Sequence, residues 1–147
     1  MKALIQRVNE ASVSIDNKLA GQIGRGIVVF IGVERDDSDE DARYLAHKIK
    51  DLRIFPRGQS EFDISVSEIN GEILVISQFT LLANLRKGRR PSFVDAALPD
   101  KAQLLYDYFV NQIRSTGLKT ETGIFQEHML VHIDNDGPFT LWMDSRK

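Results

Sequence analysis

Two short segments of this sequence carry groups that could act on a substrate. The first, Ser77-Gln78-Phe79-Thr80-Leu81, ends an apolar run and offers two hydroxyl groups, a side-chain amide and backbone N–H groups. Thr80 could be a nucleophile only if a base activates its hydroxyl, and the segment contains no His, Asp or Lys. Either a base comes from elsewhere in the fold, or the segment positions and polarises a substrate that supplies the reactive group. A structural strand end, with Phe79 and Leu81 in the core, is the remaining interpretation.

The second segment, Asp136-Gly137-Pro138, separates two strand-like runs near the C-terminus. Proline fixes φ, and most X–Pro bonds are trans, so the sequence alone does not select the cis form. In the cis form, the carbonyl groups of Gly137 and Pro138 could lie side by side and accept hydrogen bonds from an ammonium group. Backbone acceptors would read the position of the amine and not the identity of the side chain, which is a physical way to select chirality. A Gly-Pro pair that only ends a strand is the alternative.

The sequence does not favour a metal or cofactor site. It has no cysteine, which excludes thiolate nucleophiles, disulfides and Cys-based zinc sites. Its histidines are His47, His128 and His132. If His128 and His132 share one extended strand, they lie roughly 13 Å apart, which is too far for them to bind one ion. We therefore expect a protein without a metal and without a cofactor.

Charge is unevenly distributed in a chain whose formal net charge is only −2. An acidic run at positions 36–41 fits the first turn of a helix, where the helix dipole favours negative side chains. A basic cluster contains Arg86, Lys87, Arg89 and Arg90. This cluster has two open interpretations, a solvated loop or a contact with phosphate groups.

Hydrophobic periodicity predicts the elements that position these segments. Alternating or continuous apolar runs predict strands at 1–8, 11–15, 26–33, 71–76, 129–133 and 139–143. The last two strands are expected to form an antiparallel pair joined by a tight turn at 134–138. Helical spacing predicts one helix from Ser38 to Asp51 and another from Pro99 to a stop at Gly117. The expected fold class is α+β, with a curved, mostly antiparallel, barrel-like sheet and two main helices.

The length and the polarity of the chain limit its organisation. A chain of 147 residues is most simply one domain, expected here to span residues 1–147. No apolar run approaches the roughly 18 residues that a membrane-spanning helix needs. Gln6 and Arg7 interrupt the N-terminal segment where a signal peptide would be apolar. We expect a cytoplasmic protein with no membrane partner.

Taken together, the two chemistry-bearing segments resemble the signature pair of the D-aminoacyl-tRNA deacylases, the family of the D-tyrosyl-tRNA deacylases. The resemblance covers essentially the whole chain and is strongest at 77–81, 88–93 and 135–138, where the sequence reads SQFTL, GRRPSF and NDGP. It implies a hydrolase that cleaves the ester bond of D-aminoacyl-tRNA and so proofreads chirality in translation. It leaves glycyl-tRNA open as a second substrate. It also implies a homodimer with active sites at the subunit interface, and hydrolysis assisted by a ribose hydroxyl of the tRNA.

The resemblance also assigns roles to individual residues. The catalytic end of the pocket would be formed by Ser77, Gln78, Phe79 and Thr80. The substrate would be bound by a Gly-cis-Pro filter that excludes L-aminoacyl-tRNA, by a residue that braces this filter and by two residues near the terminal adenosine: Gly137, Pro138, Arg7, Phe125 and Met129.

The chain departs from the family pattern at Gln126, Glu127, His128 and Phe139. The first three could change contacts with the adenosine or with the rest of the tRNA. Phe139 directly follows the filter, which is itself intact.

Two other classes of function are compatible with parts of the sequence. A non-catalytic nucleic-acid-binding dimer would use the basic cluster at 86–90. A small-molecule binding domain would have a purely structural Gly-Pro turn. The presence of both signature segments favours the enzyme, because a binding module has no need for both.

Overall fold

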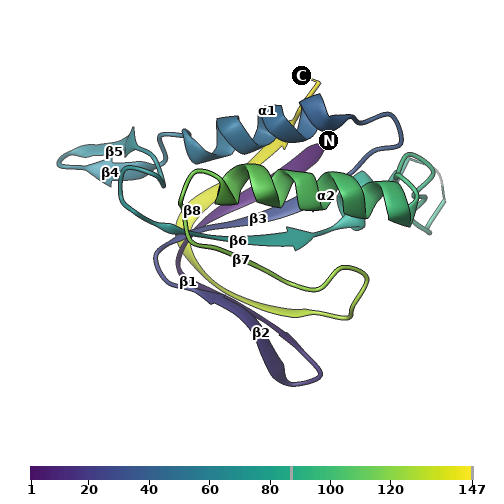
Figure 1. Ribbon diagram of the computed structural model, residues 1–147, viewed down its shortest axis with the longest axis horizontal. Helices are drawn as coiled ribbons and strands as arrows, with labels where there is room; N and C mark the ends of the chain where they lie inside the picture. The colour runs from purple at the N-terminus through teal and green to yellow at the C-terminus, as the bar shows by residue number, and fades with distance from the viewer. Residues whose placement is uncertain (87, 147) are drawn as a thin grey trace.

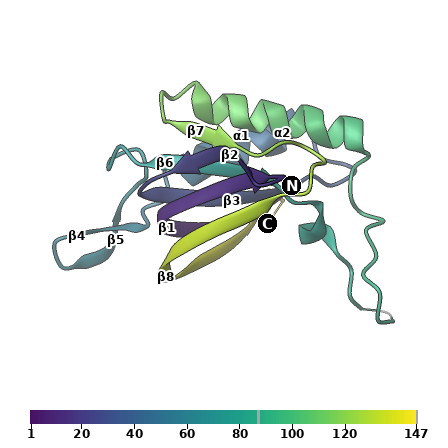
Figure 2. The ribbon, with the colours of Figure 1, turned by 90° about the horizontal axis from the view of Figure 1, so that it is seen from below.

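The computed structural model describes residues 1–86 and 88–146, so Lys87 of the predicted basic cluster lies outside the described residues (Figure 1). The elements follow in the order β1 (Lys2–Ile15), β2 (Lys18–Ile23), β3 (Gly26–Gly32), α1 (Asp39–Lys50), β4 (Phe55–Arg57), β5 (Ser60–Ile64), β6 (Glu72–Ser77), the 3-10 helix η1 (Phe79–Leu82), α2 (Pro99–Arg114), β7 (Thr120–Thr122) and β8 (Leu130–Asp144). Helices α1 and α2 lie over the same face of the sheet (Figures 1 and 2).

One six-stranded sheet forms the body of the fold. Its order is β2-β1-β3-β6-β7, and β8 pairs along β1. β1 runs antiparallel to β2, β3 and β8, whereas β3 and β6, and β6 and β7, are parallel. The first half of β1 lies beside β3 and its second half beside β2, and this second half curls away from the helices (Figure 1). The predicted α+β class, with a curved, mostly antiparallel, barrel-like sheet and two main helices, is confirmed.

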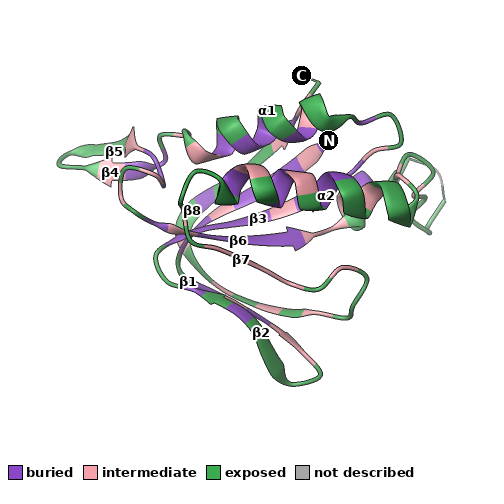
Figure 3. Cartoon of the chain, viewed as in Figure 1, coloured by how far each residue is buried: buried purple, intermediate pink, exposed green. Residues whose placement is uncertain are grey.

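The curl divides the buried apolar residues into two clusters. The larger cluster lies between the helices and the sheet and includes Ile5 from β1 and Phe109 from α2. The smaller cluster lies under the curl and includes Val13 from β1 and Ile76 from β6. Figure 3 shows buried residues where the helices meet the sheet and exposed residues on the outer helix faces. The sheet therefore has apolar partners on both faces along part of its length.

Both helices begin where the sequence predicts them. Asp41 accepts hydrogen bonds from the Ser38 backbone N–H at 2.9 Å and from its hydroxyl at 3.1 Å, so Ser38 caps α1. Burial alone would raise the pKa of Asp41, but hydrogen bonds from Ser145 and Ser38 hold this pKa below its usual value. α2 starts at Pro99, and Gly117 follows its end with φ +85°. In the described part of the chain, neither helix has the length and apolar character needed to cross a membrane.

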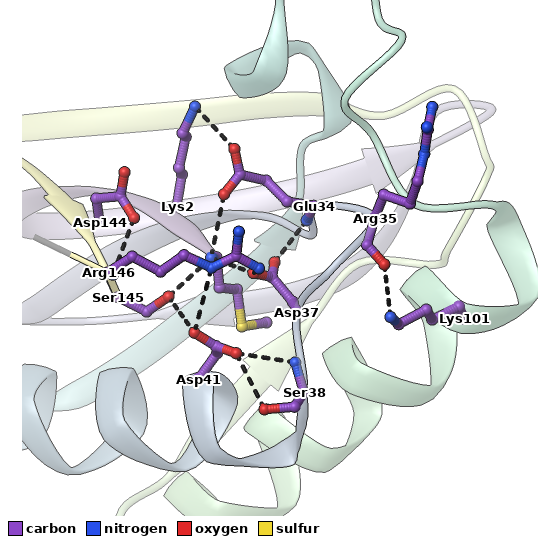
Figure 4. Close-up of polar contacts among 11 residues, drawn as sticks. Lys2, Glu34, Arg35, Asp37, Ser38, Asp41, Lys101, Asp144, Ser145 and Arg146 are labelled. Carbon is purple, nitrogen blue, oxygen red and sulfur yellow. Dashed lines mark hydrogen bonds and ion pairs between the residues drawn. The ribbon is translucent and has the colours of Figure 1, made fainter.

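A polar cluster joins the start of β1, the start of α1 and the residues after β8 (Figure 4). The Met1 ammonium group lies 2.6 Å from Asp37 Oδ1 and donates to Ser145 Oγ at 2.8 Å. Arg146 donates to the same Asp37 oxygen at 3.0 Å, and Ser145 donates to Asp41 at 2.6 Å. The buried Asp37 carboxylate is thus matched by two cations, and the cluster fixes the C-terminal end of β8 against β1.

The predicted antiparallel pair of strands at 129–133 and 139–143 is wrong. Leu130–Asp144 is one strand, β8, and it pairs with β1 along most of its length. The turn-forming residues of this segment do not reverse the chain. Gln6 pairs with Thr140 and Val8 with Asn135, so the extra residues of β8 form a bulge opposite β1, and the pairing continues on both sides of it. The Gly-Pro pair therefore lies within an edge strand, where a residue without an N–H group is tolerated.

Candidate functional site

The first predicted segment lies at the end of β6 and does not continue that strand. Only Ser77 belongs to β6, and the Gln78 N–H donates to the Ile31 carbonyl at 2.7 Å. Phe79–Leu82 then forms the 3-10 helix η1. This turn places the Phe79 ring outside the core, 58% exposed, which excludes the interpretation of Phe79 as a core residue.

The polar side chains of this segment interact with one another. Gln78 Nε2 donates a hydrogen bond to Thr80 Oγ1, and Thr80 is exposed. Within the described residues, no hydrogen bond joins the Thr80 hydroxyl to a His, Asp, Glu or Lys side chain that could act as its base. The segment thus offers an amide and a hydroxyl to a substrate but does not itself activate the hydroxyl.

Contacts on both sides of the segment hold it in place. Tyr106 of α2 donates its phenol to the Val75 carbonyl at 2.8 Å, two residues before Ser77. Burial, with a smaller contribution from Asp107, raises the pKa of Tyr106 well above its usual value, so the phenol remains a donor. On the other side of η1, Phe79 and Phe93 pack edge to face, with ring centroids 4.9 Å apart.

The second predicted segment lies within β8. The Gly137-Pro138 bond is cis, and both residues are exposed. Asn135 Nδ2 donates to the Arg7 carbonyl at 3.0 Å and to the Phe139 carbonyl at 3.1 Å, so it bridges β1 and the far side of the loop. A Cβ atom added to Gly137 would lie 2.9 Å from Asn135 Oδ1, so a side chain here would require the Asn135 amide, which holds the loop, to shift.

Arg7 of β1 contacts this loop through Asp136. Its Nε lies 2.9 Å from Asp136 Oδ2 and donates to the Asp136 carbonyl at 3.3 Å. Its Nη1 donates to the buried Ile54 carbonyl at 2.7 Å, and its guanidinium lies 5.2 Å from the centre of the Phe139 ring. The side chain is almost completely buried, so Arg7 connects the Gly-Pro loop to the segment that follows α1.

Phe125 and Met129 flank the turn between β7 and β8. Phe125 packs on Tyr106 with ring centroids 6.2 Å apart, and Met129 packs against the cluster under the curl. Gly123 makes room for Met129, because a Cβ at this position would lie 2.2 Å from the Met129 sulfur. His128 lies in this turn and His132 in β8, so the two histidines do not share one strand. Among the residues described, no group of three or more His, Cys, Asp or Glu side chains is arranged to hold a metal ion.

The register of the sheet separates the two predicted segments. Ser77 pairs with Ile31, Ile31 with Ala3 and Ala3 with Met143, so Ser77 lies three strands away from β8. The Gly137-Pro138 loop lies opposite Arg7, four residues further along β1. With spacings of about 4.8 Å between strands and 3.4 Å per residue, the two segments are roughly 20 Å apart. The chain does not bring its two halves of the predicted site together.

Two surface hollows lie elsewhere on the molecule. One, of about 340 Å³, lies over β1, β2 and β8 and is lined by Glu10, Ser12, Gln22 and His132, among others. The other, of about 410 Å³, lies between the start of α1 and α2 and is lined by Asp39, Glu40, Lys101 and Leu104, among others. Neither hollow includes the segment that begins at Ser77 or the Gly-Pro loop.

Two further residues contact the predicted site, and the sequence alone gives them no role. Asn135 holds the Gly-Pro loop through two hydrogen bonds, and Phe93 packs on Phe79. Both lie inside the segments that carry the family resemblance, at 88–93 and 135–138. Their place in these segments is the sequence signal that could have pointed to them. Their functions depend on contacts across the fold that the spacing of residues does not reveal.

The chain is similar along nearly its whole length to a family of known proteins. The family described as D-Tyr-tRNA(Tyr) deacylase matches residues 4–144. Proteins named D-aminoacyl-tRNA deacylase from Thermotoga petrophila and Desulforamulus reducens are each 52% identical over 147 residues, which are 100% of this chain and 99% of each relative. The relative of the same name from Geobacter sulfurreducens is 53% identical over 146 residues, 99% of this chain and 96% of the relative.

Solved structures share the same fold. One titled c-Myc DNA Unwinding Element Binding Protein has a TM-score of 0.92 and 37% identity, and the match covers 98% of both chains. A second, titled as a structural analysis of a probable eukaryotic D-amino acid tRNA deacylase, has a TM-score of 0.86 and 21% identity over 97% of both chains. The family match across nearly all of the sequence, and relatives about half identical over its full length, show that the chain belongs to the D-Tyr-tRNA(Tyr) deacylase family.

Proposed function

We propose that the protein hydrolyses the ester bond between a D-amino acid and the terminal adenosine of tRNA, and that each site is completed by a second copy of the chain. The deacylase activity follows from membership of the family and from the names of relatives about half identical over the full length. The products are the free D-amino acid and the tRNA. The observation that carries the two-chain site is the separation between the Ser77 end of β6 and the Gly137-Pro138 loop.

This separation is too large for one substrate to contact both segments of one chain. The amine and the ester carbonyl carbon of an amino acid lie only roughly 2.5 Å apart. The segments lie roughly 20 Å apart when strand and residue spacings are counted. If the amine is held at Gly137-Pro138 and the ester at residues 77–80, the two segments come from different chains. A two-fold symmetric dimer would form two such sites.

An apolar row on the outer face of the sheet supports association with a second copy. Register places Trp142, Leu4 and Phe30 side by side across β8, β1 and β3, on the face opposite the helices. Trp142 is 50% exposed, and the other two are partly exposed. A contiguous apolar row of this kind is typical of a surface that another protein covers.

The residues at the end of β6 would orient and polarise the ester. Gln78 and the backbone N–H groups of this segment would donate hydrogen bonds to the carbonyl oxygen as negative charge develops on it. Thr80 is held by Gln78 and would position the substrate. Because no base beside Thr80 is apparent, a ribose hydroxyl of the terminal adenosine would assist the attack of water. Phe125 and Met129 would pack near that adenosine.

The Gly-Pro loop would select chirality. Its backbone carbonyl groups would hold the substrate ammonium, and Arg7 and Asn135 would keep the loop in place. An L-residue would have to place its side chain against the loop, so the wrong enantiomer would be rejected by a steric penalty. Glycine has no side chain to reject, so this arrangement would also admit glycyl-tRNA.

Mixing of two impaired variants would test the two-chain site. The first variant, Gln78→Ala with Thr80→Ala, impairs the β6 end. The second, Gly137→Ala, should disturb the loop, because the new Cβ would lie 2.9 Å from Asn135 Oδ1 and displace the amide that holds the loop. In a statistical mixture about half of the dimers are mixed and one of the two sites in each is intact, so about a quarter of the wild-type activity on D-Tyr-tRNA should return. If each site belonged to one chain, mixing would restore nothing.

The comparison with a DNA-binding protein favours one further candidate. The solved structure with 37% identity is titled as a DNA unwinding element binding protein, so nucleic-acid binding without catalysis is the second function to test. A non-catalytic binder would retain nucleic acid and leave D-Tyr-tRNA intact. Turnover of D-Tyr-tRNA by the purified protein separates the two.

A further inference from the structure

Residues 84–86 and 88–92, here called the arginine loop, project from the body of the fold between η1 and α2 (Figure 2). Two backbone hydrogen bonds close its base, from the Asn84 N–H to the Ser92 carbonyl at 2.8 Å and from the Ser92 N–H to the Asn84 carbonyl at 3.1 Å. The side chain of Asn84 also accepts a hydrogen bond from the Arg86 N–H at 3.0 Å. Gly88, near the middle of the loop in sequence, has φ +72°, and a Cβ added to it would meet no atom within 4 Å. The loop therefore has a fixed base and an exposed tip.

The base of the loop touches the predicted site directly. Asn84 follows the end of η1 by two residues, and Phe93, which follows Ser92, packs on Phe79 at 4.9 Å between ring centroids. Four residues beyond the base can reach at most about 14 Å. The loop thus places its charged side chains beside the site, within reach of one or two nucleotides next to a bound adenosine.

The charges of this loop are not neutralised within the described part of the chain. Arg86, Arg89 and Arg90 are exposed, and no described carboxylate forms an ion pair with them. By contrast, Arg7 and Arg146 lie within 3.0 Å of carboxylate oxygens. The segment 84–92 has no Asp or Glu, although the whole chain carries a net charge of −2. This positive charge is therefore concentrated at one edge of a negative protein.

We propose that the arginine loop binds the phosphate backbone of the tRNA next to the terminal adenosine, an inference that rests on the proposed deacylase function. Guanidinium groups bind phosphate oxygens with two parallel hydrogen bonds. The segment has no aromatic residue on which a base could stack. It therefore recognises the backbone and not the bases, which suits a site whose substrates differ in tRNA sequence. The loop supplies binding energy and the residues at the end of β6 act on the ester.

Removal of the three described arginines tests this binding role. Two substrates are compared, D-Tyr-tRNA and 3′-O-(D-tyrosyl)adenosine, which lacks the phosphates that the loop would contact. The Arg86→Ala/Arg89→Ala/Arg90→Ala variant should lose kcat/KM on D-Tyr-tRNA, mainly through a higher KM, and keep wild-type kcat/KM on the adenosine ester. Each phosphate contact to a single strand contributes about 0.7 to the slope of log K against log salt concentration, so the slope should fall by about 2. Between 50 and 200 mM salt, wild-type kcat/KM should therefore fall about 20-fold more than that of the variant.

Two matched variants show whether charge at this place is what matters. Lys18→Ala/Arg43→Ala/Lys48→Ala removes three exposed positive charges from β2 and α1, and it should behave as wild type. Arg86→Lys/Arg89→Lys/Arg90→Lys keeps the charge and should retain most of the salt dependence. Sedimentation of the alanine variant should show the wild-type oligomeric state, and a change would mean that the loop contacts a second protein chain and not RNA.

The outcomes distinguish this proposal from the proposed function. If the wild-type protein cleaves neither substrate, the deacylase function itself is wrong. If it cleaves D-Tyr-tRNA and the alanine variant does so with the same kcat/KM and the same salt slope, the arginine loop does not bind the tRNA backbone. Equal losses on both substrates would also overturn the proposal, since the adenosine ester has no backbone for the loop to hold.

Discussion

Replacement of Arg7 by methionine should destabilise the fold and impair the Gly-Pro loop. Methionine keeps an unbranched apolar side chain in the buried space but removes the guanidinium group. The substitution removes the 2.7 Å hydrogen bond to the Ile54 carbonyl and the ion pair with Asp136. It also removes the cation from its place 5.2 Å above the Phe139 ring.

The expected cost follows from these three contacts. A hydrogen bond from a charged group to the buried Ile54 carbonyl contributes about 1.5–3 kcal/mol. The pair with the partly exposed Asp136 carboxylate contributes up to about 1 kcal/mol, because solvent screens it. The contact with Phe139 adds about 0.5–1 kcal/mol. Burial of the new apolar side chain offsets part of this loss, so we expect a net loss of about 3 kcal/mol in the free energy of unfolding.

Thermal and chemical denaturation followed by circular dichroism would measure this loss. For a chain of this size, about 3 kcal/mol corresponds to a fall in Tm of about 10 °C. The control is Arg43→Met. Arg43 is exposed, and its one ion pair among the described residues is an i,i+3 contact of 3.6 Å with Glu40, so this variant should change stability by less than about 0.5 kcal/mol. The folded Arg7→Met variant should also discriminate poorly between D- and L-Tyr-tRNA. A variant that stays within about 1 kcal/mol of wild type and keeps full discrimination would refute the bracing role.

Three further predictions concern catalysis and stability. Thr80→Ala should lower kcat/KM about tenfold, as expected for a lost positioning hydrogen bond, whereas a covalent aminoacyl ester trapped on Thr80 would show that it is the nucleophile. Exhaustive treatment with EDTA should leave activity unchanged, because the chain has no cysteine and its described residues form no metal-binding group; recovery only on adding zinc would contradict this. Tyr106→Phe should flatten the alkaline loss of stability, because the raised pKa of Tyr106 gives stability that is present below the unfolded pKa of about 10 and is lost as pH rises through the folded pKa. Equal stability-against-pH curves above pH 10 for both proteins would show that this phenol does not titrate on unfolding.

The helices could be predicted because their signals are local. Apolar residues recur at helical spacing, Ser38 and Pro99 mark the starts, and Gly117 follows the second helix. These features depend on residues within a few turns of one another, so no tertiary information is needed. The parallel pairing of β3 with β6 is a different matter, since it joins strands that are separated by α1 and the β4–β5 hairpin.

The strand β8 shows where local signals fail. Asn135-Asp136-Gly137-Pro138 has the composition of a tight turn, and the sequence therefore predicted two short strands. In the fold, the residues before and after this segment both pair with β1, so they form one strand. Asn135 stabilises the bulge between them by donating hydrogen bonds to the carbonyl groups of Arg7 and Phe139. Pairing with a distant strand outweighs the local turn preference.

The sequence selects the residues of the candidate site but does not give their arrangement. The resemblance points to residues 77–80, to Gly137-Pro138 and to Arg7, and in the fold Arg7 contacts Asp136 beside the Gly-Pro pair. The sequence does not predict the exposure of Phe79, because the 3-10 helix that turns it outward has no clear sequence signal. The distance between the two segments emerges only from the register of four strands.

The most direct test of the central claim compares the rates at which the purified protein hydrolyses D-Tyr-tRNA and L-Tyr-tRNA. The two substrates are used at the same concentration, with the protein in excess, so that each rate is a single-turnover rate. We expect the D-ester to be cleaved at least about 100-fold faster, which corresponds to a difference of about 2.7 kcal/mol in transition-state stabilisation, and the L-ester to decay no faster than in buffer. Equal cleavage of both esters would contradict the chiral filter, and absence of cleavage of the D-ester would contradict the deacylase function.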